Sequence, residues 1–325
     1  MGAAAGTAAA QPWWSSRWFK IGLSVVLLTV LLVKTDLSQL SRAVAKANPW
    51  WVLLATVGYV ASQLVSCFRW TMLARALGFH EPWGHFFGPY FTGMYMNLFA
   101  PSTVAGDIGR ALLIGGQKRK TLAFTTVLAD RGLGFIALSW IGALAILAQP
   151  GYRLPRLLYY AAWVIPPATV LGWMLGPPLA VRLFSPGNRW REMVERDLAP
   201  YWRDVRLLGL TSLVAVLFHG MQIVTQVFLA WGLGIRAPAA FFFVFIPVVN
   251  IAGMLPISFS GIGIREYGYM YFLAKIGVAR HTAVALGLLS SAVVLVAGLT
   301  GGLVFLLWKA PAPTPQVEEI KPATP

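Results

Sequence analysis

The sequence predicts an all-α integral membrane protein, a polytopic helix bundle with six to eight spans. Of its 325 residues 58% are hydrophobic and only 11% are charged, whereas a soluble domain carries about 25% charged residues. Several apolar runs also reach the roughly 17–25 residues that a helix needs to cross a hydrocarbon core about 30 Å thick. Helices are expected because a lipid-exposed strand would leave backbone groups unpaired.

Six apolar runs predict full spans, at 19–35, 50–68, 121–148, 157–176, 207–231 and 282–308. Together they define one transmembrane domain over 19–308, preceded by a cytoplasmic N-terminal segment at 1–18. The proline-rich residues 309–325 are expected to form a disordered tail. The polar connection at 177–206 holds six arginines, and it predicts either an amphipathic helix on the cytoplasmic surface or a solvated loop.

Two further apolar segments, at about 85–114 and 239–278, are interrupted by proline, glycine and charged residues. Both contain the pattern P-x4-G-x3-R with an asparagine upstream, namely Asn97, Pro101, Gly106 and Arg110, then Asn250, Pro256, Gly261 and Arg265. Broken helices at matching positions of two halves are typical of binding sites in transporters built from internal repeats. We therefore expect two broken or re-entrant segments related by an internal repeat.

The distribution of basic residues allows two topologies. If both broken segments are re-entrant, six spans remain, both termini are cytoplasmic and the repeat is inverted. If each segment crosses once, there are eight spans, both termini lie outside and the repeat is parallel. Each arrangement puts 16 Lys and Arg inside and 9 outside, so the positive-inside rule does not separate them. We favour the re-entrant arrangement, because P-x4-G with charge fits poorly on a lipid-facing helix.

The net charge of +15 does not indicate nucleic acid, because the basic residues lie between the apolar runs as loop anchors do. The single cysteine, Cys67, excludes an internal disulfide. No H-E-x-x-H pattern is present, so neither a metal site nor a cofactor is expected. The sequence also lacks G-x4-G-K-[ST], which means that uphill transport would need ion coupling or a partner.

Charged residues at membrane depth are the main candidates for function, because burying them in a membrane is costly. Three pairs qualify: Asp107 with Arg110, Asp130 with Arg131, and Arg265 with Glu266. The planar fork of arginine suits a phosphate headgroup. Backbone N–H groups at Gly106, Gly109, Gly261 and Gly263, and the hydroxyl of Ser258, would approach the same anion. Asn97 and Asn250 are further candidates, with Pro101 and Pro256 shaping the two loops.

A structural interpretation of the same residues is also open. Asp107 and Arg110 are three residues apart and can neutralise each other on one helix face. Asp130 would then clamp Arg110, and Glu266 would clamp Arg131. The two asparagines would be helix–helix hydrogen-bond partners. His219, on an apolar run, is expected to be a bonded structural residue.

At these positions the chain resembles the lysylphosphatidylglycerol synthase transmembrane-region family. The resemblance covers about residues 20–308, and its most specific part is Leu255-Pro256 followed by Gly261-Ile262-Gly263-Ile264-Arg265-Glu266. It implies a flippase-like, lipid-handling protein of the bacterial inner (plasma) membrane, as a stand-alone member without the aminoacyltransferase domain. One departure is Ala100-Pro101-Ser102, where the family more often has a Leu-Pro-Gly type of run.

Three functions follow as expectations. The first is a transporter that binds a lipid with an anionic headgroup, such as a membrane phospholipid or a polyprenyl or hopanoid-type lipid, and moves it between leaflets. The second is a non-transporting accessory subunit that works with a lipid-biosynthesis enzyme, in a hopanoid or glycolipid pathway for example. The third is an intramembrane lipid-modifying enzyme that depends on His219 or Asp130, although the sequence contains no catalytic motif.

Overall fold

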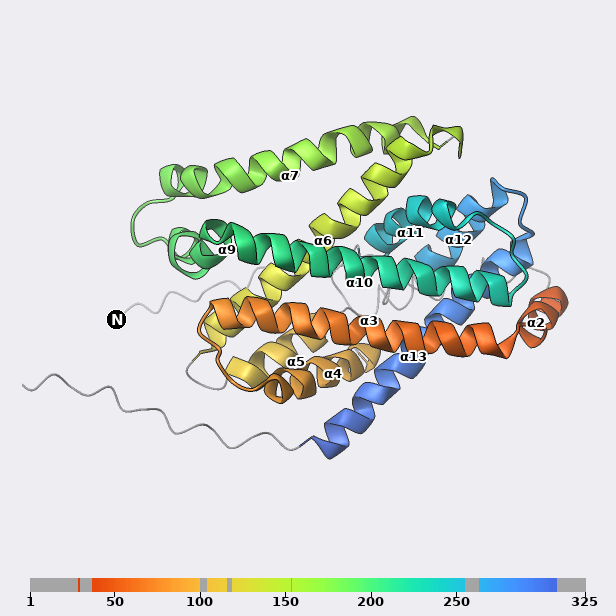
Figure 1. Ribbon diagram of the computed structural model, residues 1–325, viewed down its shortest axis with the longest axis horizontal. Coiled ribbons are helices and arrows are strands. Elements are labelled where there is room, and N and C mark those ends of the chain that lie inside the picture. The colour runs from red at the N-terminus through yellow and green to blue at the C-terminus, as the bar shows by residue number, and fades with distance from the viewer. Residues whose placement is uncertain are drawn as a thin grey trace, which may run out of the picture.

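The computed structural model describes residue 29 and residues 37–99, 104–115, 119–152, 154–254 and 263–308. Its regular elements over these residues are all helical (Figure 1). Five helices are long and apolar enough to cross a membrane: α3 (Pro49–Ala76), α6 (Lys120–Ala148), α7 (Arg156–Leu183), α10 (Val205–Gly232) and α13 (Arg280–Leu307). They correspond to five of the six predicted spans. The predicted span 19–35, the segment 1–18 and the tail 309–325 lie outside the described residues.

The spans are longer than their apolar runs suggest. Four of these helices have 28 residues and α6 has 29, so each is about 42 Å long at 1.5 Å per residue. Their ends therefore reach past a hydrocarbon core of about 30 Å. The helix of the second span continues beyond the predicted span end at residue 68, because α3 runs to Ala76 and carries Arg69 inside the helix.

The 177–206 connection is neither a single amphipathic helix nor an unstructured loop. Helix α7 extends to Leu183, even though it contains four prolines. After it come short helical pieces: α8 (Arg189–Glu192), the π-helix η3 (Met193–Asp197) and α9 (Ala199–Arg203). Asp204 then begins α10, since its carboxylate accepts a hydrogen bond from the N–H of Leu207 at 2.9 Å.

The first broken segment forms a helical hairpin of α4 (Trp83–Phe99) and α5 (Val104–Gly115). Its two ends are joined, because Arg119 donates to the carbonyl of Gly78 at 3.2 Å and pairs with Glu81. Deeper in the hairpin, a Cβ added at Gly106 would overlap the Gly93 carbonyl oxygen, so the two helices touch backbone to backbone there. The hairpin thus enters and leaves on the same side.

The second broken segment is a matching hairpin of α11 (Ala239–Met254) and α12 (Ile264–Ala274). Phe245 stacks on Phe272 with ring centroids 5.7 Å apart. Nearer the bend, a Cβ at Gly268 would lie 2.7 Å from the side chain of Val249. The later residue of α11, Val249, contacts the earlier residue of α12, Gly268. The two helices are therefore antiparallel, and α12 folds back along α11.

The two hairpins belong to an inverted repeat (Figure 1). Helices α3 and α10 lie antiparallel, because the Asn48 N–H donates to the Gly232 carbonyl at 2.8 Å at one end and the Tyr201 hydroxyl donates to the Leu73 carbonyl at 2.8 Å at the other. Helix α4 packs on α13 as α11 packs on α6, and α5 packs on α6 as α12 packs on α13. This exchange of partners confirms the re-entrant, inverted arrangement; with eight parallel spans α3 and α10 would run the same way.

Two smaller helices complete the described chain. Helix α2 (Leu37–Ala45) packs on α13, and the short 3-10 helix η2 (Pro150–Tyr152) joins α6 to α7. The turn into α3 is set by Asn48, whose side chain accepts from the N–H of Trp50, with Pro49 at the first helical position. The arginine-rich pieces between α7 and α10 lie at the end of the bundle where α3 ends (Figure 1).

Candidate functional site

A cluster of buried charges lies where α5 meets α3 and α6. The Asp130 carboxylate, near the middle of α6, accepts from Arg69 Nε at 2.9 Å and from Arg110 Nη2 at 3.0 Å. All three side chains are 6% exposed or less. The first hairpin therefore carries its arginine into the bundle to meet a carboxylate from the next span.

A second carboxylate extends this cluster. Asp107 accepts from Arg131 Nε at 2.7 Å and from Arg131 Nη2 at 3.1 Å, and it also forms an ion pair with Arg110 at 3.1 Å. Such two-point pairs are among the stronger charge-assisted hydrogen bonds. The result is a row of alternating charges, Arg69, Asp130, Arg110, Asp107 and Arg131, with three positive and two negative members.

Two hydrogen-bond donors in this row remain unused among the described residues. Arg69 Nη1 and Arg110 Nε are buried and have no partner there. Both guanidinium groups face aromatic rings, with Arg110 4.8 Å from the centroid of Trp70 and Arg69 5.5 Å from that of Phe218. A buried cluster with one excess positive charge and free N–H groups is suited to accept an anion.

The row has a graded exposure. The Arg131 side chain is 37% exposed and that of Asp107 17%, whereas those of Asp130 and Arg110 are 4% and 6% exposed. An anion approaching from the outer side of the bundle thus meets Arg131 before it meets the buried arginines. Arg131 is the member of the row with the smallest desolvation cost.

Asn97 and the glycines of the first hairpin have local partners. The Asn97 amide oxygen accepts from the N–H of Gly106 at 2.8 Å, which ties the end of α4 to the start of α5. This N–H is therefore already occupied. At Gly109 an added Cβ would overlap the sulfur of Met96, so this glycine allows close packing of the two helices. Pro101 lies outside the described residues.

The second hairpin is built differently from the first. Glu266 is fully buried and accepts from the N–H of Gly263 at 2.6 Å and from the Ser291 hydroxyl at 3.1 Å. Gly263 has φ of 86°, a conformation that favours glycine. Arg265 is half-buried, and its Nε is buried without a partner among the described residues. Asn250, near the end of α11, is half-buried.

The structure gives the predicted site residues different partners. Arg110 and Arg265 belong to opposite hairpins, and no carboxylate pairs with both of them among the described residues. The suggested Glu266–Arg131 clamp is wrong, because Arg131 pairs with Asp107, while the Asp130–Arg110 clamp is present. Pro256, Ser258 and Gly261 lie outside the described residues.

Arg69 is the residue of this cluster that the sequence analysis missed. It was counted as a loop residue because the apolar run before it ends at residue 68. A signal was available, since no glycine or proline follows until Gly78 and the helical pattern continues through Trp70, Leu73 and Ala74. His219, in contrast, has the expected structural partner: its Nε2 lies 2.9 Å from the carbonyl oxygen of Gly134.

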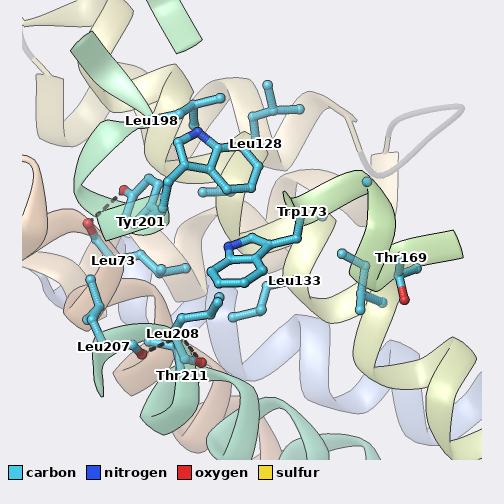
Figure 2. Close-up of a pocket in the computed structure, with 15 residues that line it drawn as sticks. Leu73, Leu128, Leu133, Thr169, Trp173, Leu198, Tyr201, Leu207, Leu208 and Thr211 are labelled. Atoms are coloured by element: carbon cyan, nitrogen blue, oxygen red, sulfur yellow. Dashed lines mark hydrogen bonds between the residues drawn. The ribbon is translucent and has the colours of Figure 1, made fainter. Parts of the chain in front are cut away.

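An apolar cavity of about 390 Å³ lies on the other side of α6 (Figure 2). Its walls come from the end of α3, from α6, α7 and α9, and from the first turns of α10. Tyr201 in this wall is held against α3, because its hydroxyl donates to the Leu73 carbonyl. Burial raises the pKa of this hydroxyl, so it stays a neutral donor.

Comparisons with known proteins agree with this architecture. A "UPF0104 membrane protein" from Methanothermobacter thermautotrophicus is 30% identical over 130 residues, which are 39% of this chain and 38% of that protein. A protein named "Glycosyltransferase AglD", from Haloferax volcanii, is 24% identical over 345 residues, covering 91% of this chain and 55% of that protein. The chain thus spans about half or less of these relatives' own length. No solved structure matches it.

The model of one family covers nearly the whole transmembrane region. It is described as the lysylphosphatidylglycerol synthase TM region, and it matches residues 17–302. The match includes both hairpins, the charge cluster and nearly all of the five described spans. The chain is therefore a multi-pass membrane protein that belongs to the lysylphosphatidylglycerol synthase transmembrane-region family.

Proposed function

We propose that this protein binds the anionic headgroup of a membrane lipid and moves that lipid between leaflets. The observation that carries the proposal is the charge row between the first hairpin, α3 and α6, in which Arg69 and Arg110 have donors unused by any described residue. If the row served only to stabilise the fold, equal numbers of positive and negative charges would be enough. Here one positive charge is in excess, and the unused donors lie on Arg69 and Arg110, the two most buried arginines of the row.

The chemistry of the donors favours a phosphate-type group. Arg69 and Arg110 present planar guanidinium groups, which keep their charge and match phosphate oxygens better than lysine does. Asp130 and Asp107 hold these groups in place. A phospholipid or a polyprenyl phosphate-type lipid supplies such a headgroup together with a chain that suits the membrane interior.

The inverted repeat supports movement as well as binding. The two hairpins enter the bundle from opposite sides, so rocking of one half against the other would open a site to each leaflet in turn. Arg265, whose Nε has no partner among the described residues, would serve the second half in the way that Arg110 serves the first. The bacterial-type inner (plasma) membrane, with the arginine-rich side toward the cytoplasm, is part of this proposal.

A second candidate is an accessory role in building a lipid-linked glycan. The observation that favours it is the relative named glycosyltransferase, which aligns with 91% of this chain but is itself nearly twice as long. In that role the protein would hold a lipid for a separate enzyme without transporting it. Both candidates require lipid binding, and translocation distinguishes them.

Lipids that co-purify with the protein test the binding step. The protein would be extracted in mild detergent and its lipids identified by mass spectrometry, for wild type, Arg69→Gln, Arg110→Gln and the control Arg75→Gln. Arg75 lies on the same helix as Arg69 but is exposed and is not part of the charge row. We expect one anionic lipid to be enriched in wild type and Arg75→Gln and lost in the other two. A bulk-membrane lipid profile in all four proteins would refute a headgroup site.

A further inference from the structure

The cavity between α6, α7, α9 and α10 has an apolar lining that includes two polar atoms to which the described residues offer no partner. The indole N–H groups of Trp173 and Trp202 are buried and bond to no group among the described residues. Figure 2 shows the Trp173 ring in the middle of the cavity, between Tyr201 and Leu133. A buried indole N–H usually has an acceptor, so an occupant that brings an acceptor would complete this site.

The surroundings indicate what this occupant is. Helices α6, α7 and α10 are membrane spans, so the molecules available to the cavity are lipid chains. Its volume of about 390 Å³ lies at the lower end of the range for ligand pockets. That size suits one hydrocarbon chain with its ester linkage, whose carbonyl oxygen can accept from an indole N–H.

Charges beside the cavity favour an anionic lipid. Arg203 and Arg206 are exposed and are neighbours in the chain of Trp202 and Leu207, which line the cavity. Asp204 lies between them, but its carboxylate caps α10. A phosphate at this end of the bundle would therefore meet two arginines while its chain enters the cavity.

We infer that the cavity is a second lipid site, which holds one ester-linked acyl chain of an anionic phospholipid beneath a headgroup on Arg203 and Arg206. The indole N–H of Trp173 or that of Trp202 donates to its ester carbonyl. This site goes beyond the proposed function, because it is separate from the charge row and would exist in a transporter or in an accessory subunit.

A photo-crosslinking experiment on the full chain in phosphatidylcholine vesicles tests this inference. The probe is phosphatidylglycerol with a diazirine in one acyl chain, and labelled peptides are located by mass spectrometry. Gly132 lines the cavity and has no heavy atom within 4 Å of an added Cβ, so Gly132→Phe fills the space. Gly209→Phe is the matched control, since Gly209 is equally open but does not line the cavity.

We expect labelling of α6 and α7 lining residues in wild type and Gly209→Phe, with a several-fold loss in Gly132→Phe. Labelling of the outer face of α13 should not change. Equal labelling of the cavity in all three proteins, or cavity labelling no stronger than that of α13, would overturn the inference.

Two further comparisons test the polar contacts. An ester-linked probe should label the cavity about fivefold better than its ether-linked analogue, as expected for one hydrogen bond, and Trp173→Phe with Trp202→Phe should abolish the difference. Arg203→Gln with Arg206→Gln should remove the preference for phosphatidylglycerol over phosphatidylcholine, whereas Arg110→Gln should leave it. Loss of cavity labelling in Arg110→Gln would show that this is not a separate site, while failure of the cavity experiment alone would leave the proposed headgroup site standing.

Discussion

Replacing Asp130 by asparagine removes the carboxylate on which the charge row depends. The asparagine side chain has nearly the same shape as that of aspartate, so the change is electrostatic. In wild type, Asp130 bonds Arg69 at 2.9 Å and Arg110 at 3.0 Å, and all three side chains are buried. The Asp130→Asn variant leaves Arg69 without a carboxylate and Arg110 with Asp107 alone.

The size of the effect follows from what the two arginines lose. Removing one partner of a buried ion pair costs about 3–5 kcal/mol, because the other charge stays buried and uncompensated. Arg110 keeps one ion pair and both guanidinium groups keep aromatic neighbours, so the lower end of that range, about 3 kcal/mol, is expected. The excess positive charge of the row rises from one to two.

The loss of stability is measured by heating the protein in detergent and using size-exclusion chromatography to determine how much folded protein remains at each temperature. A double variant, Asp130→Asn with Arg69→Gln, restores the excess charge to one and should recover more than half of the lost stability. An anionic lipid should stabilise Asp130→Asn more than it stabilises wild type, because the row then has two excess positive charges and not one. A loss below about 1 kcal/mol, typical of an exposed pair, together with no rescue in the double variant, would refute the buried charge row.

Three other perturbations test the fold around the site. Gly106→Ala should destabilise the protein by about 1–3 kcal/mol, because its Cβ would overlap the Gly93 carbonyl oxygen; thermal unfolding measures this. Glu266→Gln should cost about 1–3 kcal/mol in the same assay, because a buried carboxylate with two hydrogen bonds is replaced by a neutral group. The cysteines of His80→Cys and Lys120→Cys, at exposed positions that flank the first hairpin, should react with an impermeant maleimide from the same side of the membrane.

Each of these predictions has a control or a contradicting result. Gly209→Ala should be nearly neutral, because nothing lies within 4 Å of its added Cβ. Glu195→Gln should cost less than about 1 kcal/mol, since its pair with Arg191 is on the surface. Labelling of His80→Cys and Lys120→Cys from opposite sides would show that the hairpin crosses the membrane and would contradict the inverted repeat.

The spans and the two hairpins could be predicted from the sequence because their signals are local. An apolar run of sufficient length predicts a span by itself, and the recurrence of P-x4-G-x3-R predicted a repeat. The charge count left two topologies open, since both arrangements place the same number of Lys and Arg residues on each side of the membrane. The antiparallel contacts at Asn48 and Tyr201 decide between them.

The partners of the charged residues could be predicted only in part. The Asp107–Arg110 pair follows from helix spacing, and Asp130 was suggested as a partner of Arg110. Arg69 could not be linked to Asp130, because they are 61 residues apart and meet only through the packing of α3 on α6. The bonds of Glu266 to Gly263 and Ser291 likewise depend on how α12 lies against α13.

Lipid translocation in reconstituted vesicles tests the central claim most directly. A fluorescent phosphatidylglycerol in the inner leaflet becomes accessible to dithionite only when it is moved outward, and fluorescent phosphatidylcholine serves as the neutral comparison. We predict that wild type and Arg75→Gln move the anionic probe faster than the neutral one, and that Arg110→Gln and Arg265→Gln lose this difference while remaining folded. Equal, background rates for both probes in wild type would contradict translocation by the protein alone and would favour the accessory role.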